Sequence, residues 1–512
     1  MAEHPPLPGD GESYWMHTTP TTSYAPLADD GAEVDVAVVG GGMAGLSTAW
    51  ELALAGRSVA VLEADRIAAG VSGHTTAKLS AQHGAVYAHL RRTRGAEGAR
   101  WYATSQLEAV ERVFATVAEL GIDCALERAP SFVYARDQAA VPGLREEAEA
   151  AQEAGLDAEF VTTTGLPFEI AGAVRAGNQA QFHPRAYLLA LAEELSRRGA
   201  RVHERTRVTG LTEGSPCRLT TESGATLTAR DVVVATHHPV FDRALLFARL
   251  SPWRELVVAA PLDAAADPGG MYLTTEDHKR SVRTAPLPDG QRLLIVTGEE
   301  FTPGAGGIAE RFLRLERWMW EHFPVTETRY RWAAQDLDPS DTVAMAGLFH
   351  PGARHTYVAT GFGGWGMSGG VLAGRLISDL VQGREPVWAP LYDPRRLWPA
   401  LREAPNLLRQ QADVAQHFVG DRLRTRHPDQ VGDIPPGEGA VVRIDGRRCA
   451  VYRDEDGTTH AVSARCTHLG CLVAFNDAER TWECPCHGSR FAIDGSVLQG
   501  PAVRPLEPCD PQ

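Results

Sequence analysis

The chain has 512 residues, enough for two or three domains with a large core. Its hydrophobic content of 44% and charged content of 22% are ordinary for a globular protein, and its formal net charge of −15 argues against nucleic acid or an anionic membrane surface as main partner. No apolar run reaches the roughly 18 residues of a membrane span. The N-terminus also lacks a basic region followed by an apolar one, so we expect a cytoplasmic protein without a secretory signal.

Residues 1–33 are polar and proline-rich, and they include Tyr14, Trp15 and Tyr24. This composition is typical of a flexible tail, whereas the aromatic residues favour an arm that docks on the rest of the protein.

Residues 34–63 read as a strand, a glycine turn, a helix, a second strand and a final acid, which is the dinucleotide-binding fingerprint in its structural context. Gly40 provides the tight turn, Gly42 lets the backbone approach a pyrophosphate, and Gly45 allows the helix to pack closely on the strand. Without both strands, the helix and the acid, a GxGxxG pattern would be weak support for this prediction.

The helix after this turn begins at Met43 and Ala44, where unpaired N–H groups and the positive end of the helix dipole favour phosphate binding. Glu63, at the end of the second strand, is expected to accept hydrogen bonds from ribose hydroxyls.

A loop rich in glycine, serine and threonine spans residues 70–76, and a helix is expected after it. Small residues allow a backbone to lie against a planar ring. The expected cofactor contacts in this loop are Ser72, Gly73, Thr75 and Thr76. His74, Lys78 and His83 are candidates to lie beside the ring, although each also suits a helix cap or a surface position.

Helical and strand-like patterns alternate from residue 97 to residue 245, which favours a parallel sheet. The expected helices cover residues 97–120, 141–154 and 184–199, and the expected strands cover residues 130–135, a short run ending near 208, and 232–235.

Residues 255–300 differ, because four strand-like runs and a hairpin turn at residues 287–290 predict an inserted antiparallel sheet. Such a sheet can roof a ligand site. Arg283 is therefore either a substrate contact or a solvent-facing strand residue.

A second formal GxGxxG pattern comprises Gly361, Gly363 and Gly366, but no strand with a terminal acid follows it. We interpret it as a closing loop over the same cofactor, with a helix N-terminus near the cofactor ring. The expected contacts are Gly363, Gly364, Trp365, Gly366 and Met367.

The first glycine turn, the SGHTTAK loop, the ATHHP turn and the GFGGWGMSGG loop resemble FAD-dependent oxidoreductases of the D-amino-acid oxidase type, a group that includes glycine-, sarcosine- and dimethylglycine-oxidising enzymes. The resemblance covers residues 34–390. It implies FAD, a backbone contact to the adenine near Val208, and oxidation of a C–N bond by hydride transfer to the flavin.

The resemblance also bears on catalysis and on FAD attachment. Some members bind FAD covalently through a histidine that follows the small-residue loop, and Ala77 occupies that position here, so non-covalent FAD is expected. Related amine oxidases carry a basic side chain near the position of Lys78. Lys78, followed by His74, is therefore the candidate catalytic residue.

Residues 396–427 are charged and helical in pattern, and we interpret them as a linker. In residues 428–512, strand-like runs are separated by turns at Asp445–Gly446 and Asp456–Gly457, which predicts a small antiparallel β-domain.

This domain contains the motifs CTHLGC and CPCHGS, in which Cys466 pairs with His468 and Cys484 pairs with His487. Two thiolates and two imidazoles are suitable ligands for zinc. The complete pattern more specifically resembles the Rieske [2Fe–2S] motif, where two cysteines hold one iron and two histidines hold the other.

By that resemblance, Cys471 and Cys486 form a disulfide between the two loops, and Ser489 donates a hydrogen bond to a bridging sulfide. High-potential respiratory Rieske proteins have a tyrosine where this chain has Phe491, so we expect a lower reduction potential here. The remaining cysteines are interpreted as ordinary thiols: Cys124, Cys217, Cys449 and Cys509.

The predicted fold is therefore an α/β FAD-binding, Rossmann-like oxidoreductase with an inserted antiparallel sheet, followed by a small all-β Rieske domain. We expect an arm over residues 1–33 and an oxidoreductase domain over 34–395, with FAD-binding parts at about 34–90, 180–245 and 335–390 and a substrate-side sheet at about 250–330.

A flavin accepts two electrons as hydride, whereas a Rieske cluster carries one. The presence of both cofactors favours a relay in which an amine or amino acid reduces FAD, and a surface-exposed cluster passes single electrons to a redox partner.

Two alternatives stay open. One is an electron-transfer component for an oxygenase, although no nicotinamide-binding unit or mononuclear iron site is recognisable. The other is a redox sensor or scaffold without turnover.

Overall fold

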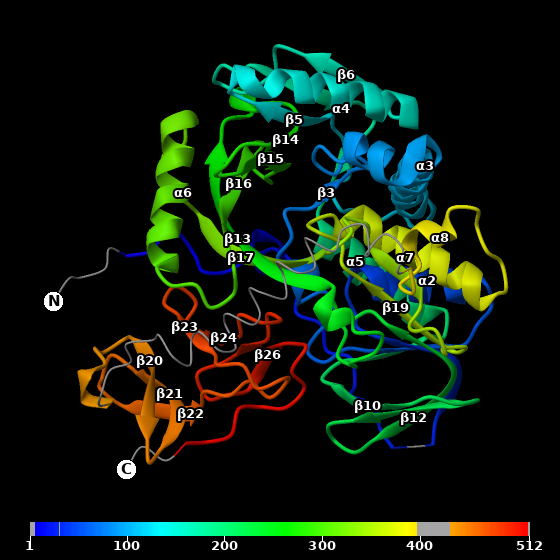
Figure 1. Cartoon of the computed structure of the whole chain (residues 1–512), viewed down its shortest axis with the longest axis vertical. Helices are drawn as coiled ribbons and strands as arrows, with labels where there is room; N and C mark the ends of the chain where they lie inside the picture. Colours follow the sequence, from blue (N-terminus) through cyan, green and yellow to red (C-terminus); the bar gives the residue numbers. More distant parts are fainter. Residues whose placement is uncertain (1–5, 30, 397–430, 510–512) are drawn as a thin grey trace.

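The computed structural model describes residues 6–29, 31–396 and 431–509. The body, residues 6–396, contains two eight-stranded sheets and a small three-stranded one, and the C-terminal domain, residues 431–509, contains a three-stranded and a four-stranded sheet (Figure 1). The predicted helical linker lies outside the described residues, apart from residue 396.

The first sheet has the predicted parallel centre. β1 (Glu33–Val39) pairs in parallel with β2 (Val59–Leu62) and with β12 (Thr226–Val234). These strands are rich in valine and largely buried, as expected for a parallel sheet covered on both faces. The order is β10-β11-β12-β1-β2-β9, and β19 and β18 extend it from the end of β12. The further strands are β9 (Arg201–His203), β10 (Val208–Thr212), β11 (Cys217–Thr221), β18 (Met345–Leu348) and β19 (Thr356–Thr360).

Helices α2 (Met43–Leu54) and α7 (Gly366–Val381) pack directly against each other. A Cβ atom on Gly374 would lie 2.7 Å from the backbone of Ser47, and one on Gly370 would lie 3.1 Å from the Ala44 nitrogen. The two helices therefore begin close together, although their sequences lie more than 300 residues apart. Helix α5 (Pro184–Arg197) also packs against α2.

The second sheet is larger than the predicted insertion, because three strands from earlier in the chain join it. Its order is β17-β13-β16-β15-β14-β5-β7-β6, and every pairing except β5–β14 is antiparallel. Helix α6 (Ile308–His322) runs beside β13 and β16 (Figure 1), and α4 (Val141–Ala154) packs on β6 and β7. The strands are β5 (Ser131–Ala135), β6 (Ala158–Val161), β7 (Gly172–Ala176), β13 (Leu250–Leu262), β14 (Met271–Thr274), β15 (Arg280–Pro286), β16 (Arg292–Phe301) and β17 (Tyr330–Pro339).

The helix predicted directly after the small-residue loop is wrong. Residues Lys78–Leu79 form β3, whose backbone pairs with β8 (Ala180–Gln181), and β8 also pairs with β4 (Glu127–Arg128). Helix α3 (Tyr87–Leu120) begins later, and Gly95 interrupts its helical geometry with a φ of +76°. Pairing with a distant strand therefore outweighs the local helical pattern here.

The described part of the N-terminal arm docks on the small-residue loop. Tyr14 and Trp15 lie in the short helix α1 (Tyr14–His17), and both are buried. The Trp15 indole N–H donates to the Thr75 carbonyl at 2.6 Å, and the Ser13 hydroxyl donates to the Gly73 carbonyl. The arm thus fixes the backbone of this loop from outside.

The C-terminal domain has the predicted turns at residues 445–446 and 456–457. Cys449 and Cys509 were expected to be unpaired thiols, but they form a disulfide, with Cα atoms 6.1 Å apart. The physical reason is that the C-terminal segment follows β22, where the Cys509 N–H donates to the Ala461 carbonyl at 3.0 Å. The strands are β20 (Gly439–Ile444), β21 (Arg447–Arg453), β22 (Thr459–Ser463), β23 (Ala474–Asn476), β24 (Thr481–Glu483), β25 (Arg490–Phe491) and β26 (Val497–Gln499).

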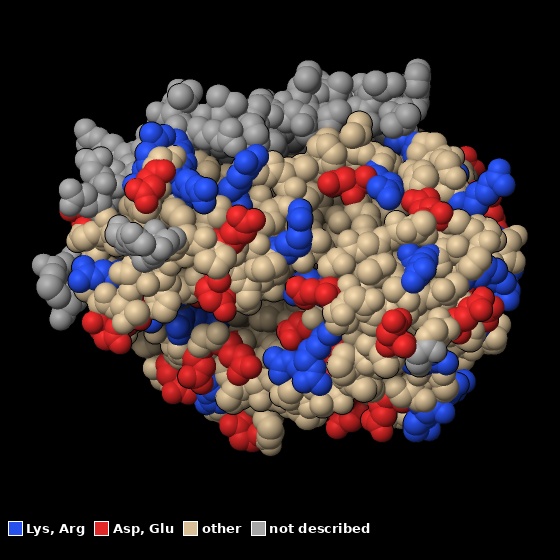
Figure 2. All heavy atoms as spheres, turned by 90° about the horizontal axis from the view of Figure 1, so that it is seen from below, with Lys and Arg blue, Asp and Glu red and all other residues tan. Residues whose placement is uncertain are grey.

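Within the described ranges, no helix is both long enough and apolar enough to cross a bilayer. On the face shown in Figure 2, acidic and basic side chains are interspersed.

Candidate functional site

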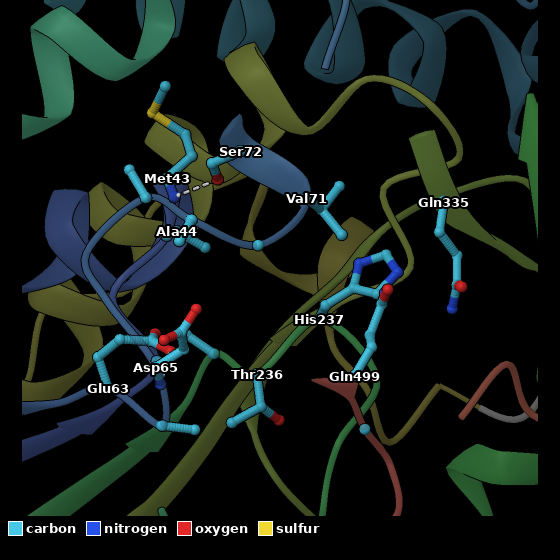
Figure 3. Close-up of a pocket in the computed structure, with 18 of the residues that line it drawn as sticks. Met43, Ala44, Glu63, Asp65, Val71, Ser72, Thr236, His237, Gln335 and Gln499 are labelled. Carbon is cyan, nitrogen blue, oxygen red and sulfur yellow. Dashed lines mark hydrogen bonds between the residues drawn. The ribbon is translucent and has the colours of Figure 1, made fainter. Parts of the chain in front are cut away.

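The main cavity lies where β1 and β2 end and where α2 and α7 begin (Figure 3). Ten residues predicted from the sequence line it: Gly40, Gly42, Met43, Ala44, Glu63, Ser72, His74, Val208, Gly366 and Met367. The structure therefore brings the first glycine turn, the small-residue loop and the second glycine loop to one site.

The first glycine turn is tightly packed. Gly40 has a φ of +111°, and a Cβ atom there would lie 2.4 Å from the Ala235 carbonyl oxygen. A Cβ atom on Gly45 would lie 1.9 Å from the Gly40 carbonyl oxygen. Only glycine satisfies both positions. The Met43 N–H, at the start of α2, donates to Ser72 Oγ at 2.9 Å, which places this hydroxyl at the helix N-terminus (Figure 3).

Glu63 is held in place at the end of β2. Its carboxylate accepts the Gly41 N–H at 2.7 Å and the Asp65 N–H at 2.9 Å. Burial raises the pKa of Glu63, and the two backbone hydrogen bonds oppose that effect. A carboxylate offers about four acceptor positions. Glu63 therefore retains capacity for ribose hydroxyls, and the glycine cradle with its helix N-terminus fits a dinucleotide.

The other predicted cofactor residues lie around the cavity rather than in its wall. Gly73 and Thr75 accept hydrogen bonds from the arm, and the Thr76 carbonyl accepts one from Arg283 at 3.0 Å. Gly363 and Trp365 line a second cavity. A Cβ atom on Gly364 would lie 3.6 Å from the ring of Trp253.

Arg283 faces the interior of the protein rather than solvent. Its side chain is buried, and its guanidinium donates to the backbone carbonyls of Thr76, Ala77 and Thr284. Burial lowers the pKa of Arg283 to about 9. The solvent-facing alternative is therefore wrong, because the side chain is only 1% exposed. A substrate contact stays a prediction, although Nε and Nη1 already donate to backbone carbonyls.

Three acidic residues on one face of β13 and β17 lie beside the second glycine loop, and sequence reasoning missed them. Burial raises the pKa of Glu255 and that of Asp336 to about 7 in each case. Asp338 accepts the Trp253 indole N–H at 2.7 Å. Trp253 is paired with Asp336 across the two strands, so their side chains lie on the same face of the sheet. Residues two positions apart on a strand also share a face, which places Glu255 and Asp338 there as well. The available signal was the period-two spacing of Asp336 and Asp338, in a segment where no strand was predicted.

Lys78 lies near Glu255, one of these three acids. Its ammonium lies 3.2 Å from Thr76 Oγ1. Burial, followed by the nearby charge of Arg283, lowers the pKa of Lys78 to about 7, and Glu255 acts in the opposite direction. His74 lines the main cavity, and its Nδ1 lies 2.9 Å from the Gly70 carbonyl. His83 is buried, lines the second cavity and stacks on Trp365 with ring centroids 4.6 Å apart.

The four expected cluster ligands converge in the C-terminal domain. The rings of His468 and His487 are perpendicular, with centroids 4.8 Å apart, and Cys466 and Cys484 are buried free thiols. The Nδ1 atoms of both histidines are buried without a hydrogen-bond partner among the described residues. Buried, unpaired imidazole nitrogens near two free thiols fit the two-cysteine, two-histidine ligand set of a Rieske cluster.

The disulfide implied by the resemblance is present. Cys471 and Cys486 are bonded, with Cα atoms 6.6 Å apart, and the sulfur atoms of this pair lie within 4.8 Å of Cys484 Sγ. Ser489 is fully buried, lies beside the Cys466 thiol and accepts the Ala502 N–H at 3.0 Å. Phe491 is also fully buried.

The histidine end of this site is covered by the body, contrary to the expected surface position. His468 Nε2 lies 3.2 Å from Asp242 Oδ1, and the His468 side chain is 7% exposed. The rings of His238 and Phe247 lie 5.8 Å from that of His487. The residues that cover the ligands therefore come from the segment after β12, which no pattern within the C-terminal motifs could indicate.

Buried charges hold the two parts together. Arg254 on β13 is 0% exposed and forms ion pairs with Glu479 and Glu483 of the C-terminal domain. The Asp477 carboxylate accepts the Ile308 N–H at 2.9 Å, and thereby caps helix α6 from the other domain. Arg490, Leu498, Gln499, Gly500 and Val503 of the C-terminal domain also line the main cavity (Figure 3 labels Gln499).

Comparison with known proteins agrees with this arrangement. Residues 35–380 match the family described as FAD dependent oxidoreductase (DAO). The chain belongs to this family. Residues 428–510 match the Rieske [2Fe-2S] domain, which decides between the cluster and zinc in favour of the cluster. The body is thus the flavin domain and the C-terminal domain is the Rieske domain.

One relative spans the whole chain. It is the putative Rieske 2Fe-2S iron-sulfur protein YhfW of Bacillus subtilis, which is 34% identical over 504 residues that cover 98% of this chain and 97% of the relative. Among solved structures, glycine oxidase from Geobacillus kaustophilus has a TM-score of 0.58 at 22% identity, and L-proline dehydrogenase from P. horikoshii has 0.59 at 17%. They cover 71% and 72% of this chain and 99% of their own, and at this identity they show the fold alone.

The protein is therefore an FAD-dependent oxidoreductase with a Rieske domain. FAD and one [2Fe–2S] cluster are its cofactors, and the residues of both sites fit them.

Proposed function

We propose that the protein oxidises a C–N bond of an amine or amino acid, and that the electrons pass from the flavin site to the Rieske domain and then to a separate redox partner. One observation carries this proposal: residues of the Rieske domain line the same cavity as the dinucleotide fingerprint. The two cofactor sites therefore share a boundary, as an internal relay requires.

The proposed FAD site uses the first glycine turn and the start of α2 for the pyrophosphate, Glu63 for the ribose, and the backbone near Val208 for the adenine. Bound non-covalently, FAD supplies hydride acceptance. The second glycine loop orients the ring end, with the N-terminus of α7 nearby, and the Rieske domain excludes water from the outer side.

The residues beside the second glycine loop are suited to proton transfer. An amine gives up hydride only in its neutral form, so a cationic substrate must first lose a proton. Lys78 Nζ and the Glu255 carboxyl both have a pKa near 7, and either can hold that proton at neutral pH. In this proposal Lys78 accepts it, and Asp336 and Asp338 favour a cationic group in the cleft.

The proposed ligands of the cluster are Cys466 and Cys484 for one iron and His468 and His487 for the other. The Cys471–Cys486 disulfide fixes the two loops around it.

The test is anaerobic mixing of holoprotein with a panel of amines and amino acids. Bleaching of the flavin band and the reduced-Rieske EPR signal are followed together. A compound that bleaches the flavin before the cluster signal rises supports the proposal and names the substrate class. If no compound does so, but an external reductase with NADH reduces cluster and flavin, electrons enter from outside and the protein serves another enzyme.

A further inference from the structure

The turn after β12 reaches both cofactor sites. Thr236 and His237 line the flavin cavity (Figure 3), whereas the next residue, His238, is 1% exposed and lies against the cluster ligands. Consecutive Cα atoms are about 3.8 Å apart. The two sites are therefore separated at this point by neighbouring residues of one chain segment.

The conformation of this turn directs its two histidines to different sites. His237 has a φ of +65°, in the left-handed region that non-glycine residues seldom adopt. The Thr360 hydroxyl donates to the His237 carbonyl at 2.5 Å, and the Thr236 hydroxyl donates to the His238 carbonyl at 2.8 Å. A sparsely populated conformation persists when the surrounding structure fixes it, and such positions cluster at functional sites.

His238 touches both histidine ligands. Its ring centroid lies 6.0 Å from that of His468 and 5.8 Å from that of His487, and both contacts are edge-on. Its Nδ1–H donates to the Pro239 carbonyl at 3.1 Å. The Nε2 atoms of His237 and His238 are buried, and neither has a hydrogen-bond partner in the described part of the chain. Apart from the bond from His238 Nδ1 to Pro239, packing and the backbone hydrogen bonds of the turn therefore place the pair.

The Rieske domain is held on this turn by contacts on several sides. Gln335 Nε2 donates to the Gly488 carbonyl at 3.0 Å, beside the ligand His487. Arg207 Nη2 donates to the Val497 carbonyl at 3.2 Å, and Asp242 contacts His468. Because the ligand histidines already face the flavin domain, electron transfer between the sites requires no swing of the Rieske domain.

We propose that His237 and His238 form the electron path between the flavin pocket and the cluster. This proposal rests on the proposed relay. In each passage the reduced flavin loses one electron and the cluster gains one. The two electrons of one substrate therefore leave in two passages, the flavin protons are released to water, and a one-electron acceptor protein reoxidises the cluster each time. Neither histidine is itself oxidised, because the path consists of their bonds and ring contacts.

The test compares holoprotein with the variants His238→Leu and His238→Phe. Anaerobic flash photoreduction with 5-deazariboflavin avoids the need for a known substrate, and the absorbance of flavin and cluster is followed separately in time. The control is His460→Leu, because His460 is a partly exposed histidine on β22 that stacks on Tyr452. Flavin content, the amplitude of the reduced-cluster EPR signal and hydrogen exchange in residues 466–471 and 484–489 are measured for each protein.

We expect His238→Leu to slow flavin-to-cluster transfer severalfold, with both cofactors bound and exchange in the two loops unchanged. His238→Phe should keep most of the rate, because it retains a ring against both ligands, and His460→Leu should match the unmodified protein. An unchanged rate in His238→Leu overturns the path, as does a loss of rate that is accompanied by faster exchange, which would indicate undocking. If the unmodified protein shows no transfer, the relay itself fails rather than its route.

Discussion

The two cofactor sites of this protein are built in different ways. The four proposed cluster ligands lie within residues 466–487, on two loops whose conformation depends on nearby turns and one disulfide. The flavin cavity instead draws on segments from Gly40 to Val503, including strands of both large sheets and part of the Rieske domain. A local motif is therefore sufficient for the first site, whereas the second depends on packing between distant segments.

The boundary between the two sites is built in a third way, because each domain covers part of the other domain's site. The two histidines proposed as cluster ligands are buried by the flavin domain, and the flavin cavity is partly closed by the Rieske domain. Each domain thus supplies the outer wall of the other domain's site. If this is correct, disturbing the contact between the domains should affect both sites, whereas changes inside one site should leave the other unchanged.

The largest effect is expected for Arg254→Ala, which removes the cation buried between Glu479 and Glu483. Arg490 still contacts Glu479 at 3.1 Å and Glu483 at 3.4 Å, so the cost should stay below the about 3–5 kcal/mol of breaking a buried pair completely. We expect a lower urea midpoint, faster release of FAD and faster hydrogen exchange in both cluster loops. The matched control is Arg480→Ala, because Arg480 forms an exposed ion pair with Glu455 and should contribute less than about 1 kcal/mol.

The same contact predicts how docking depends on pH. Burial opposes ionisation of Glu479, but Arg254 and Arg490 outweigh it and hold the pKa at about 2, below the ordinary value of 4.5. Its stabilising contribution is therefore complete above about pH 4.5 and is lost as the pH falls towards 2.

If Arg254→Ala keeps the urea midpoint and FAD affinity of the unmodified protein, the two sites do not support each other.

The sequence predicted the features that depend on local pattern. The first glycine turn lines the main cavity beside the parallel strands, and the Cys471–Cys486 disulfide is present, as spacing and resemblance predicted. The cluster ligands stay a prediction, which the convergence of the two histidine rings and two free thiols supports. The errors involve pairing over long distances. Lys78 joins a strand instead of a helix because β8 is available, Cys449 meets Cys509 across β22, and Arg283 is drawn inward by the carbonyls of Thr76 and Ala77. None of these partners is adjacent in sequence, so no periodic pattern indicates them.

A smaller effect, confined to the flavin side, is expected for Lys78→Met. With a pKa of about 7, Lys78 is largely neutral above that pH, so the rate of flavin reduction by substrate should rise through about pH 7 and then level off. Removing a general base typically costs about 100-fold or more, and the variant should lose the rise as well. A rise displaced above pH 7 in the variant would instead indicate that Glu255 replaces it, because loss of the neighbouring cation raises the pKa of this carboxyl further.

The control for Lys78→Met is Lys279→Met, since Lys78 and Lys279 are the two lysines of the chain and Lys279 is 54% exposed. Stopped-flow traces over pH 5–9 would show the difference. Retention of the pH profile in Lys78→Met would remove this lysine from catalysis, and a change in the cluster EPR signal would contradict the separation of the two sites.

The smallest effect is expected on the cluster side, for Phe491→Tyr. Phe491 is fully buried on β25 near the cluster loops, where the resemblance places a tyrosine in high-potential Rieske proteins. A new hydrogen bond is worth about 1 kcal/mol, and a tenfold change in a one-electron equilibrium is about 59 mV, so the potential should rise by tens of millivolts. A redox titration followed by EPR measures the shift.

Because the hydroxyl needs space in a packed core, the unfolding midpoint of the variant is measured as well. A stable variant with an unchanged or lower potential would show that the residue at position 491 does not set the potential.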